Sequence, residues 1–168
     1  MPSQITIKLK CEKYLVKFLE TMHGPSPISF PKNSNFNTML DVFLDKPPLD
    51  WKEPDFDENC LEIRLPFFED KNVLYNNYLT VLKQEIFIKN LKKYFKITFR
   101  GEISKYVVMG LDRQDSIDLF IDKYNLSQDN RDMLEKDFQR YLKIRSNKRL
   151  FRNKIISSVK DPICPEVS

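Results

Sequence analysis

The sequence predicts a small α+β protein: a sheet of two or three strands with helices near the N-terminus, then a mostly helical C-terminal half. Apolar and polar residues alternate over residues 5–9 and again over 61–65, which is typical of half-buried strands. Over most of the remaining chain, apolar residues recur at helical spacing. Hydrophobic residues make up 41% of the 168 residues, so the chain has enough apolar material to bury a core.

The N-terminal region, residues 1–70, is expected to run β-α-(β)-α-β. A first helix is predicted over 12–22, where Gly24 and Pro25 end it. Residues 28–31 are a possible short extended piece, and a second helix is expected to begin after an Asn33 or Ser34 cap. Because the strand patterns at 5–9 and 61–65 resemble each other, we expect these two strands to share one small sheet.

The next region, residues 71–155, is expected to be helical, and residues 156–168 to form a tail. One long helix or two is predicted from Tyr75 to Phe95. The pattern over 97–111 is ambiguous between strand and helix. Two further helices are predicted, over 113–124 and from about 129 to 146, with a short turn between them.

These last two helices form a hairpin that resembles a helix-turn-helix. Asn125 tolerates the left-handed conformation that such a turn requires. Leu126 is expected to fill the corner between the helices, and Ser127 to cap the second one. In a helix-turn-helix the second helix enters the DNA major groove, so the pattern predicts a nucleic-acid interface over residues 113–154. An ordinary helical hairpin is the alternative.

The second helix of this hairpin runs into a strongly basic segment. Residues 71–168 carry 20 basic and 12 acidic side chains, whereas residues 1–70 carry 8 and 12. Cations at helical spacing can neutralise several phosphates. A solvated or protein-binding basic helix is the other interpretation. The candidate phosphate contacts are Arg140, Lys143, Arg145, Lys148, Arg149, Arg152 and Lys154.

Base-contacting residues are expected near the start of the second helix. Gln128, Asn130 and Arg131 are the candidates there, because Asn, Gln and Arg make bidentate contacts to base edges. The alternative is that these three residues are helix caps and ordinary surface residues.

A second basic cluster is interleaved with aromatic residues, an arrangement found in some proteins that bind single-stranded nucleic acid. The more common interpretation is that the aromatic side chains are core and the cations line the wet face. The cations of this cluster are Lys89, Lys92, Lys93, Lys96 and Arg100.

Residues typical of catalysis are scarce, so an enzyme is not expected. His23 is the single histidine, and it lies beside a turn glycine. Asp115, Asp118 and Asp122 share one helical face, where Mg²⁺ or plain solvation are the two interpretations, and solvation is preferred. No phosphate-cradling glycine loop, zinc spacing or nucleophile elbow occurs. We therefore expect no cofactor and no metal.

The cysteines and the hydropathy indicate a cytoplasmic protein. The three cysteines are odd in number and widely spaced, which disfavours a disulfide framework and fits a reducing compartment. No apolar run approaches the length of a membrane span, and no secretory signal is expected at the N-terminus.

The helix that ends at Tyr124, followed by Asn125-Leu126-Ser127, resembles the helix-turn-helix of many phage and mobile-element regulators. The chain as a whole, including Leu65-Pro66-Phe67-Phe68, also resembles small proteins carried by phages and integrative elements of gut Bacteroidetes. The resemblance implies a DNA-binding accessory or regulatory protein. The alternative is a phage structural or assembly protein that acts through protein–protein contacts or self-association, and that would then be a virion component.

Overall fold

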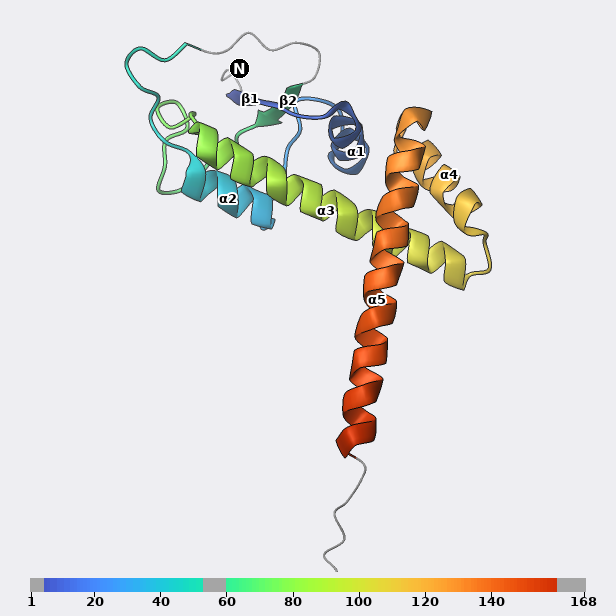
Figure 1. Cartoon of the computed structure of the whole chain (residues 1–168). Helices are drawn as coiled ribbons and strands as arrows, with labels where there is room; N and C mark the ends of the chain where they lie inside the picture. The colour runs from blue at the N-terminus through green and yellow to red at the C-terminus, as the bar shows by residue number, and fades with distance from the viewer. Residues whose placement is uncertain (1–4, 53–59, 160–168) are drawn as a thin grey trace, which may run out of the picture. The chain divides into compact units, whose positions relative to one another are not determined.

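The computed structural model describes residues 5–52 and 60–159, with residues 151–159 described only as the course of a helix. The chain divides into two compact units, Met1–Gln128 and Asp129–Ser168. The α+β prediction is confirmed. The elements, labelled in Figure 1 except for the short 3₁₀ turn η1, are β1 (Thr6–Lys10), α1 (Lys13–His23), α2 (Asn35–Phe43), β2 (Cys60–Arg64), α3 (Val81–Val108), α4 (Arg113–Lys123), η1 (Gln128–Asn130) and α5 (Arg131–Val159).

The sheet consists of β1 and β2, paired antiparallel as the two alternating patterns predicted. Ile7 lies opposite Ile63 and Leu9 opposite Leu61, and all four side chains are buried. The expected extended piece at residues 28–31 contributes one parallel bridge, at Ile28. Its amide donates to the Glu62 carbonyl (2.8 Å), and its carbonyl accepts from the Arg64 amide (2.8 Å).

α1 ends, and α2 begins, at the cap that the sequence predicts. Gly24 follows α1 with φ 97° and donates its amide to the Glu20 carbonyl (2.9 Å). A positive φ of this kind favours glycine, which has no Cβ. Ser34 precedes α2, and its hydroxyl oxygen accepts from the Asn37 amide (3.2 Å), which satisfies a donor that would otherwise lack a partner.

α3 is one helix, and the ambiguous segment 97–111 is helical as far as Val108. Phe95, Phe99 and Ile103 follow at every fourth position and are buried. The predicted start at Tyr75 is wrong, because Tyr78 pairs its backbone with Asp45 in an isolated antiparallel bridge. Those backbone groups are therefore not available for helical hydrogen bonds, and α3 starts after the Thr80 cap.

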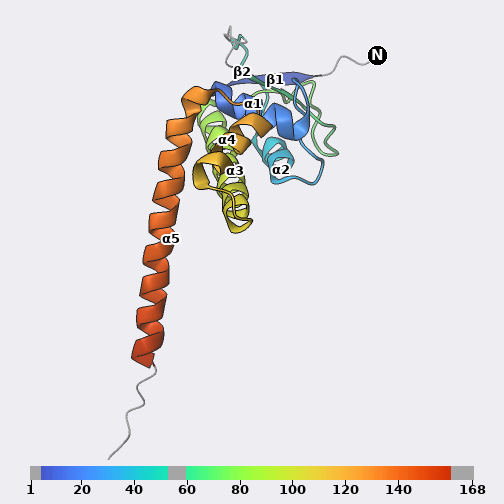
Figure 2. The ribbon, with the colours of Figure 1, turned by 90° about the vertical axis from the view of Figure 1, so that its right-hand side faces the viewer.

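The core of the first unit is aromatic and joins its N-terminal elements to α3 and α4. Phe18 of α1 packs edge-on against Phe95 of α3, with ring centroids 5.0 Å apart. Phe99 packs in the same way against Phe120 of α4 (5.0 Å). Figures 1 and 2 show α2 beside the N-terminal half of α3 and α4 along its C-terminal half. The elements of residues 5–68 thus share one core with α3.

α4 ends in a Schellman motif, the hydrogen-bonded helix stop that a left-handed residue allows. Asn125 has φ 51°, as expected for the turn, and donates its amide to the Asp122 carbonyl (3.2 Å). The Leu126 amide donates to the Ile121 carbonyl (3.0 Å), and both of these side chains are buried. The two bonds satisfy carbonyls at the helix end.

α5 extends to Val159, so its predicted end at about residue 146 is wrong. The apolar periodicity fades after Leu142, but the chain holds no glycine or proline between residues 131 and 161. Nothing in the local sequence therefore stops the helix. The helix also takes up the first residues of the expected tail, 156–159, and residues 160–168 lie outside the described part.

Candidate nucleic-acid interface

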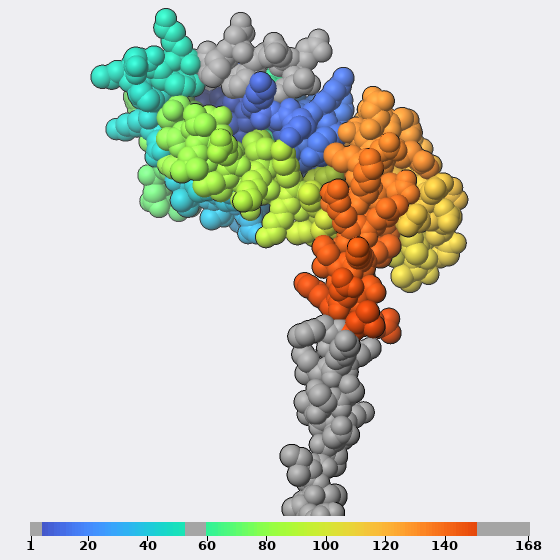
Figure 3. Space-filling view, viewed as in Figure 1, coloured from blue at the N-terminus to red at the C-terminus, as the bar shows by residue number. Residues whose placement is uncertain are grey.

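The second unit carries a long, uniformly charged stretch of helix. We call residues 139–159 of α5 the basic segment: it holds seven Lys and Arg residues and no Asp or Glu. Every side chain from Leu142 to Leu150 is exposed, in contrast to the buried Leu134 and Phe138 earlier in the helix. Figure 3 shows the part of this segment up to residue 150, in orange to red, with its side chains at the molecular surface.

The cations of the basic segment are available to a ligand. Within the part of the chain whose side chains are described, no hydrogen bond or ion pair is formed by Arg140, Lys143, Arg145, Lys148 or Arg149. The predicted contacts Arg152 and Lys154 follow in the same helix, but their side chains lie outside the described residues. An exposed cation without a protein partner loses no internal contact when it binds a phosphate.

Like charges in the basic segment repel one another. Arg145 is three residues from Lys148 and four from Arg149, spacings that bring side chains together on a helix. Each such like-charge pair destabilises a helix by roughly 0.2–0.5 kcal/mol. A polyanion bound to this segment would reduce the repulsion between these side chains.

The predicted base-contacting residues lie at the start of the second unit and just before it. Gln128 and Asn130 fall in η1, and Arg131 is the first residue of α5. Gln128 is exposed, whereas Asn130 and Arg131 are half-buried and engaged in contacts. All three precede the basic segment by at least eight residues.

The second predicted cluster, on α3, separates into core and surface. Leu91, Phe95 and Phe99 are buried, and the Tyr94 ring packs against Phe18 (5.7 Å between centroids). Lys92 pairs with Glu12 of the same unit. The Phe95 and Phe99 rings are therefore occupied within the core, whereas the Tyr94 ring is only half-buried.

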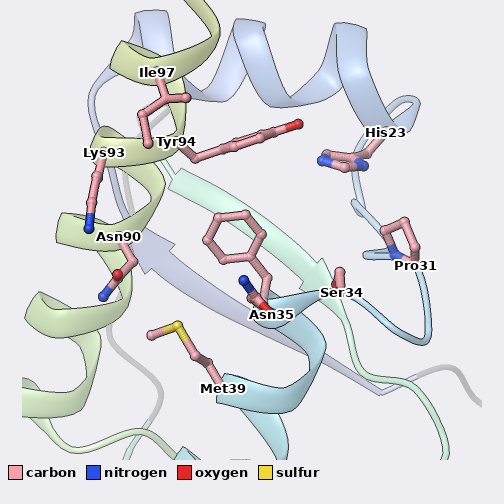
Figure 4. Close-up of a pocket in the computed structure, with 10 residues that line it drawn as sticks. His23, Pro31, Ser34, Asn35, Met39, Asn90, Lys93, Tyr94 and Ile97 are labelled. Atoms are coloured by element: carbon pink, nitrogen blue, oxygen red, sulfur yellow. The ribbon is translucent and has the colours of Figure 1, made fainter.

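A pocket of about 450 Å³ opens between α2 and α3. Figure 4 shows Asn90, Lys93, Tyr94 and Ile97 entering it from α3. The facing side chains are Ser34, Asn35, Phe36 and Met39 from α2 and its cap, with His23 and Pro31. The lining holds one cation and no acid, and it offers a ligand mainly apolar and aromatic contact.

Cys11 and His23, two side chains with catalytic potential, have pKa values that burial shifts. Burial raises the pKa of Cys11 to about 12, so its thiol stays protonated and unreactive at neutral pH. Burial also lowers the pKa of His23, whose ring packs edge-on against Phe30 (5.2 Å). Among the described residues, no group of His, Cys, Asp and Glu side chains could hold a metal ion. Cys164 lies outside that part of the chain.

Comparisons with protein-family models, with curated proteins and with solved structures gave no match. Across residues 5–52 and 60–159, no helix combines the length and apolarity that a bilayer crossing requires.

Proposed function

We propose that this protein binds DNA through the basic segment of α5 and acts as an accessory or regulatory DNA-binding protein. The observation that carries the proposal is the exposure of residues 142–150 on a helix with seven cations and no acid over 21 residues. A helix end that only complements its own dipole needs cations in its last turn, and here they extend over about four turns. The resemblance to phage and mobile-element regulators suggests where such a protein would act.

Phosphate contact is the chemistry that this segment supports. Each Lys or Arg that neutralises a phosphate releases condensed counterions, so affinity falls steeply with salt. The five cations with described side chains would together give a log–log salt slope of about −4 to −5. One helix, α5, carries all five of these exposed cations: Arg140, Lys143, Arg145, Lys148 and Arg149.

The proposal is tested by fluorescence anisotropy with a labelled 30-base-pair duplex of random sequence, at about 50 and 200 mM salt. Wild-type protein is expected to bind at the lower salt and to lose about 100-fold or more in affinity at the higher one. The variant Arg145→Glu/Lys148→Glu/Arg149→Glu should lose about 100-fold in affinity at the lower salt, and its salt slope should be smaller by about three.

A matched control reverses three exposed lysines of the first unit. Lys32→Glu/Lys46→Glu/Lys52→Glu changes the net charge by the same amount, and all three side chains are exposed. We expect it to weaken binding less than about fivefold, because these lysines lie outside the basic segment. Equal losses of affinity in both variants would show that binding depends on net charge alone and not on the basic segment. No binding of the wild-type protein at low salt would refute the proposal.

A second candidate function is assembly through protein–protein contacts. At the end of α3, Val107, Val108 and Met109 are consecutive and exposed by 42, 87 and 66%. Adjacent exposed apolar side chains are characteristic of contact surfaces. If this candidate is correct, Val108→Glu should reduce self-association measured by light scattering while DNA binding stays unchanged.

A further inference from the structure

The angular distribution of side chains around α5 divides the exposed helix into distinct faces. At about 100° per residue, Lys136, Arg140 and Lys143 fall on one side of the helix. Arg145, Lys148 and Arg149 fall on nearly the opposite side. All six side chains are exposed. The exposed part of α5 therefore carries two stripes of cations: the Arg140 stripe (Lys136, Arg140, Lys143) and the Arg145 stripe (Arg145, Lys148, Arg149).

One of the two faces between the stripes carries the uncharged polar residues Gln139 and Ser146, together with Glu135 and the exposed Leu142 and Leu150. Gln139 and Ser146 are seven residues apart, so they share one side of the helix, roughly 80–120° from each stripe. Both are exposed, and the Gln139 amide donates to the Glu135 carboxylate (3.2 Å) one turn earlier. The opposite face carries the exposed apolar residues Met133 and Ile144. We call the side of Gln139 and Ser146 the polar face.

From this arrangement we infer that α5 lies in the major groove of double-stranded DNA with its polar face toward the base edges. The inference rests on the proposed DNA binding. A helix in the major groove has one phosphate backbone on each side, and two opposed cation stripes match these two backbones. The groove floor presents hydrogen-bond donors and acceptors for Gln139 and Ser146, and thymine methyl groups that Leu142 and Leu150 can contact.

The same geometry argues against the other nucleic-acid ligands. A single strand presents one phosphate backbone, which one stripe would satisfy while the other stayed solvated. Duplex RNA has a deep, narrow major groove that side chains cannot read. The B-form major groove is about 12 Å wide, close to the 10–12 Å diameter of an α-helix with its side chains.

The base contacts are thereby assigned to residues that differ from those expected at the turn. Gln makes bidentate contacts to adenine, and Ser contacts any base edge through its hydroxyl. Gln139 and Ser146 lie between the cations that would contact the phosphates, whereas Gln128 precedes the first of these cations, Lys136, by eight residues. Phosphate contacts and base contacts therefore come from one continuous stretch of helix.

The test is selection of bound sequences from a pool of 30-base-pair duplexes whose central 16 positions are random, followed by sequencing. Wild-type protein is expected to enrich some sequences over others by about tenfold or more. The variant Gln139→Ala/Ser146→Ala should bind the whole pool with unchanged salt dependence, while its enrichment falls to about twofold or less. Alanine favours the helix at both exposed positions, so the fold is retained.

Two single variants serve as controls. Gln114→Ala removes an exposed glutamine of α4 and should leave the enrichment unchanged. Gln128→Ala should do the same, and a flattened enrichment in this variant would return base contact to the turn and overturn the inference.

The remaining outcomes separate this inference from the proposed function. Wild-type protein that binds the pool without enrichment would overturn the assignment of the polar face and leave phosphate binding intact. Affinity for duplex RNA or single-stranded DNA equal to that for duplex DNA would overturn the major-groove placement. If the wild-type protein fails to bind any duplex at low salt, the proposed function falls as well.

Discussion

Tyr124 and His23 of the first unit have pKa values that their surroundings shift. The Tyr124 hydroxyl donates to the Glu102 carboxylate (2.6 Å), which also accepts from the Lys123 ammonium group (2.7 Å). Burial and this hydrogen bond raise the pKa of Tyr124 to about 12. The cluster ties α4 to α3 with a charge-assisted hydrogen bond at the edge of the aromatic core.

His23 makes stability depend on pH. Burial holds the pKa of His23 below its usual 6.5, because the charged ring is poorly solvated there. The unfolded chain takes up a proton near the usual pKa, before the folded chain does. Stability from the neutral ring is therefore full above about pH 6.5 and is lost as the pH falls below it.

We expect the urea midpoint of wild-type protein to fall more between pH 7.5 and 5.5 than that of His23→Phe. Phenylalanine does not titrate, and it keeps a ring against Phe30. Urea unfolding followed by circular dichroism at both pH values measures the difference. Equal falls in the two proteins would show that His23 does not contribute to the pH dependence.

At the scale of elements, α3 contains a glycine that its packing does not require. Gly101 lies inside the helix and is exposed, and a Cβ placed there would meet no atom within 4 Å. Glycine in a helix interior costs about 0.5–1 kcal/mol relative to alanine. The buried residues before and after Gly101, such as Phe99 and Ile103, offset this cost through their packing in the core.

The variant Gly101→Ala should raise the free energy of unfolding by about 0.5–1 kcal/mol, as measured by urea titration. Gly110→Ala is the matched control. Gly110 also has open space around its Cα, but its φ of 96° disfavours any side chain. We expect that control to be destabilised by about 1 kcal/mol or more. A destabilised Gly101→Ala protein would contradict the account of α3.

For the whole molecule, stability and DNA binding are expected to depend on different parts of the chain. The buried apolar side chains lie between residues 5 and 138, whereas residues 142–150 are exposed throughout. Removing exposed, mutually repelling cations should cost the folded core little. A chain that ends at Leu142 keeps Leu134 and Phe138 and lacks most of the basic segment.

This shortened chain should unfold within about 3 °C of the full chain by calorimetry, a shift that corresponds to about 1 kcal/mol. It should also bind random duplex DNA about 100-fold more weakly at low salt, by the same anisotropy measurement. Undiminished DNA affinity would place the phosphate contacts elsewhere, for example on the exposed lysines of α3. A much lower unfolding temperature would show that the basic segment stabilises the core.

The sequence by itself determined the features that rest on local geometry. The alternation of Ile7 and Leu9 predicted a strand, and the cap at Ser34 and the left-handed turn at Asn125 were predicted from the side chains that such positions favour. The cations of the basic segment are likewise evident in the sequence. These predictions succeeded because each depends on a few neighbouring residues.

Only the tertiary structure decided which side chains are buried and which are exposed. The sequence left the segment 97–111 ambiguous, and burial of Phe99 and Ile103 against distant elements made it helical. The backbone pairing of Tyr78 with Asp45 moved the start of α3, because it joins residues far apart in the chain. The exposure of residues 142–150 was likewise undecided, since a basic helix can be packed or free. Burial depends on non-local contacts, which periodicity does not encode.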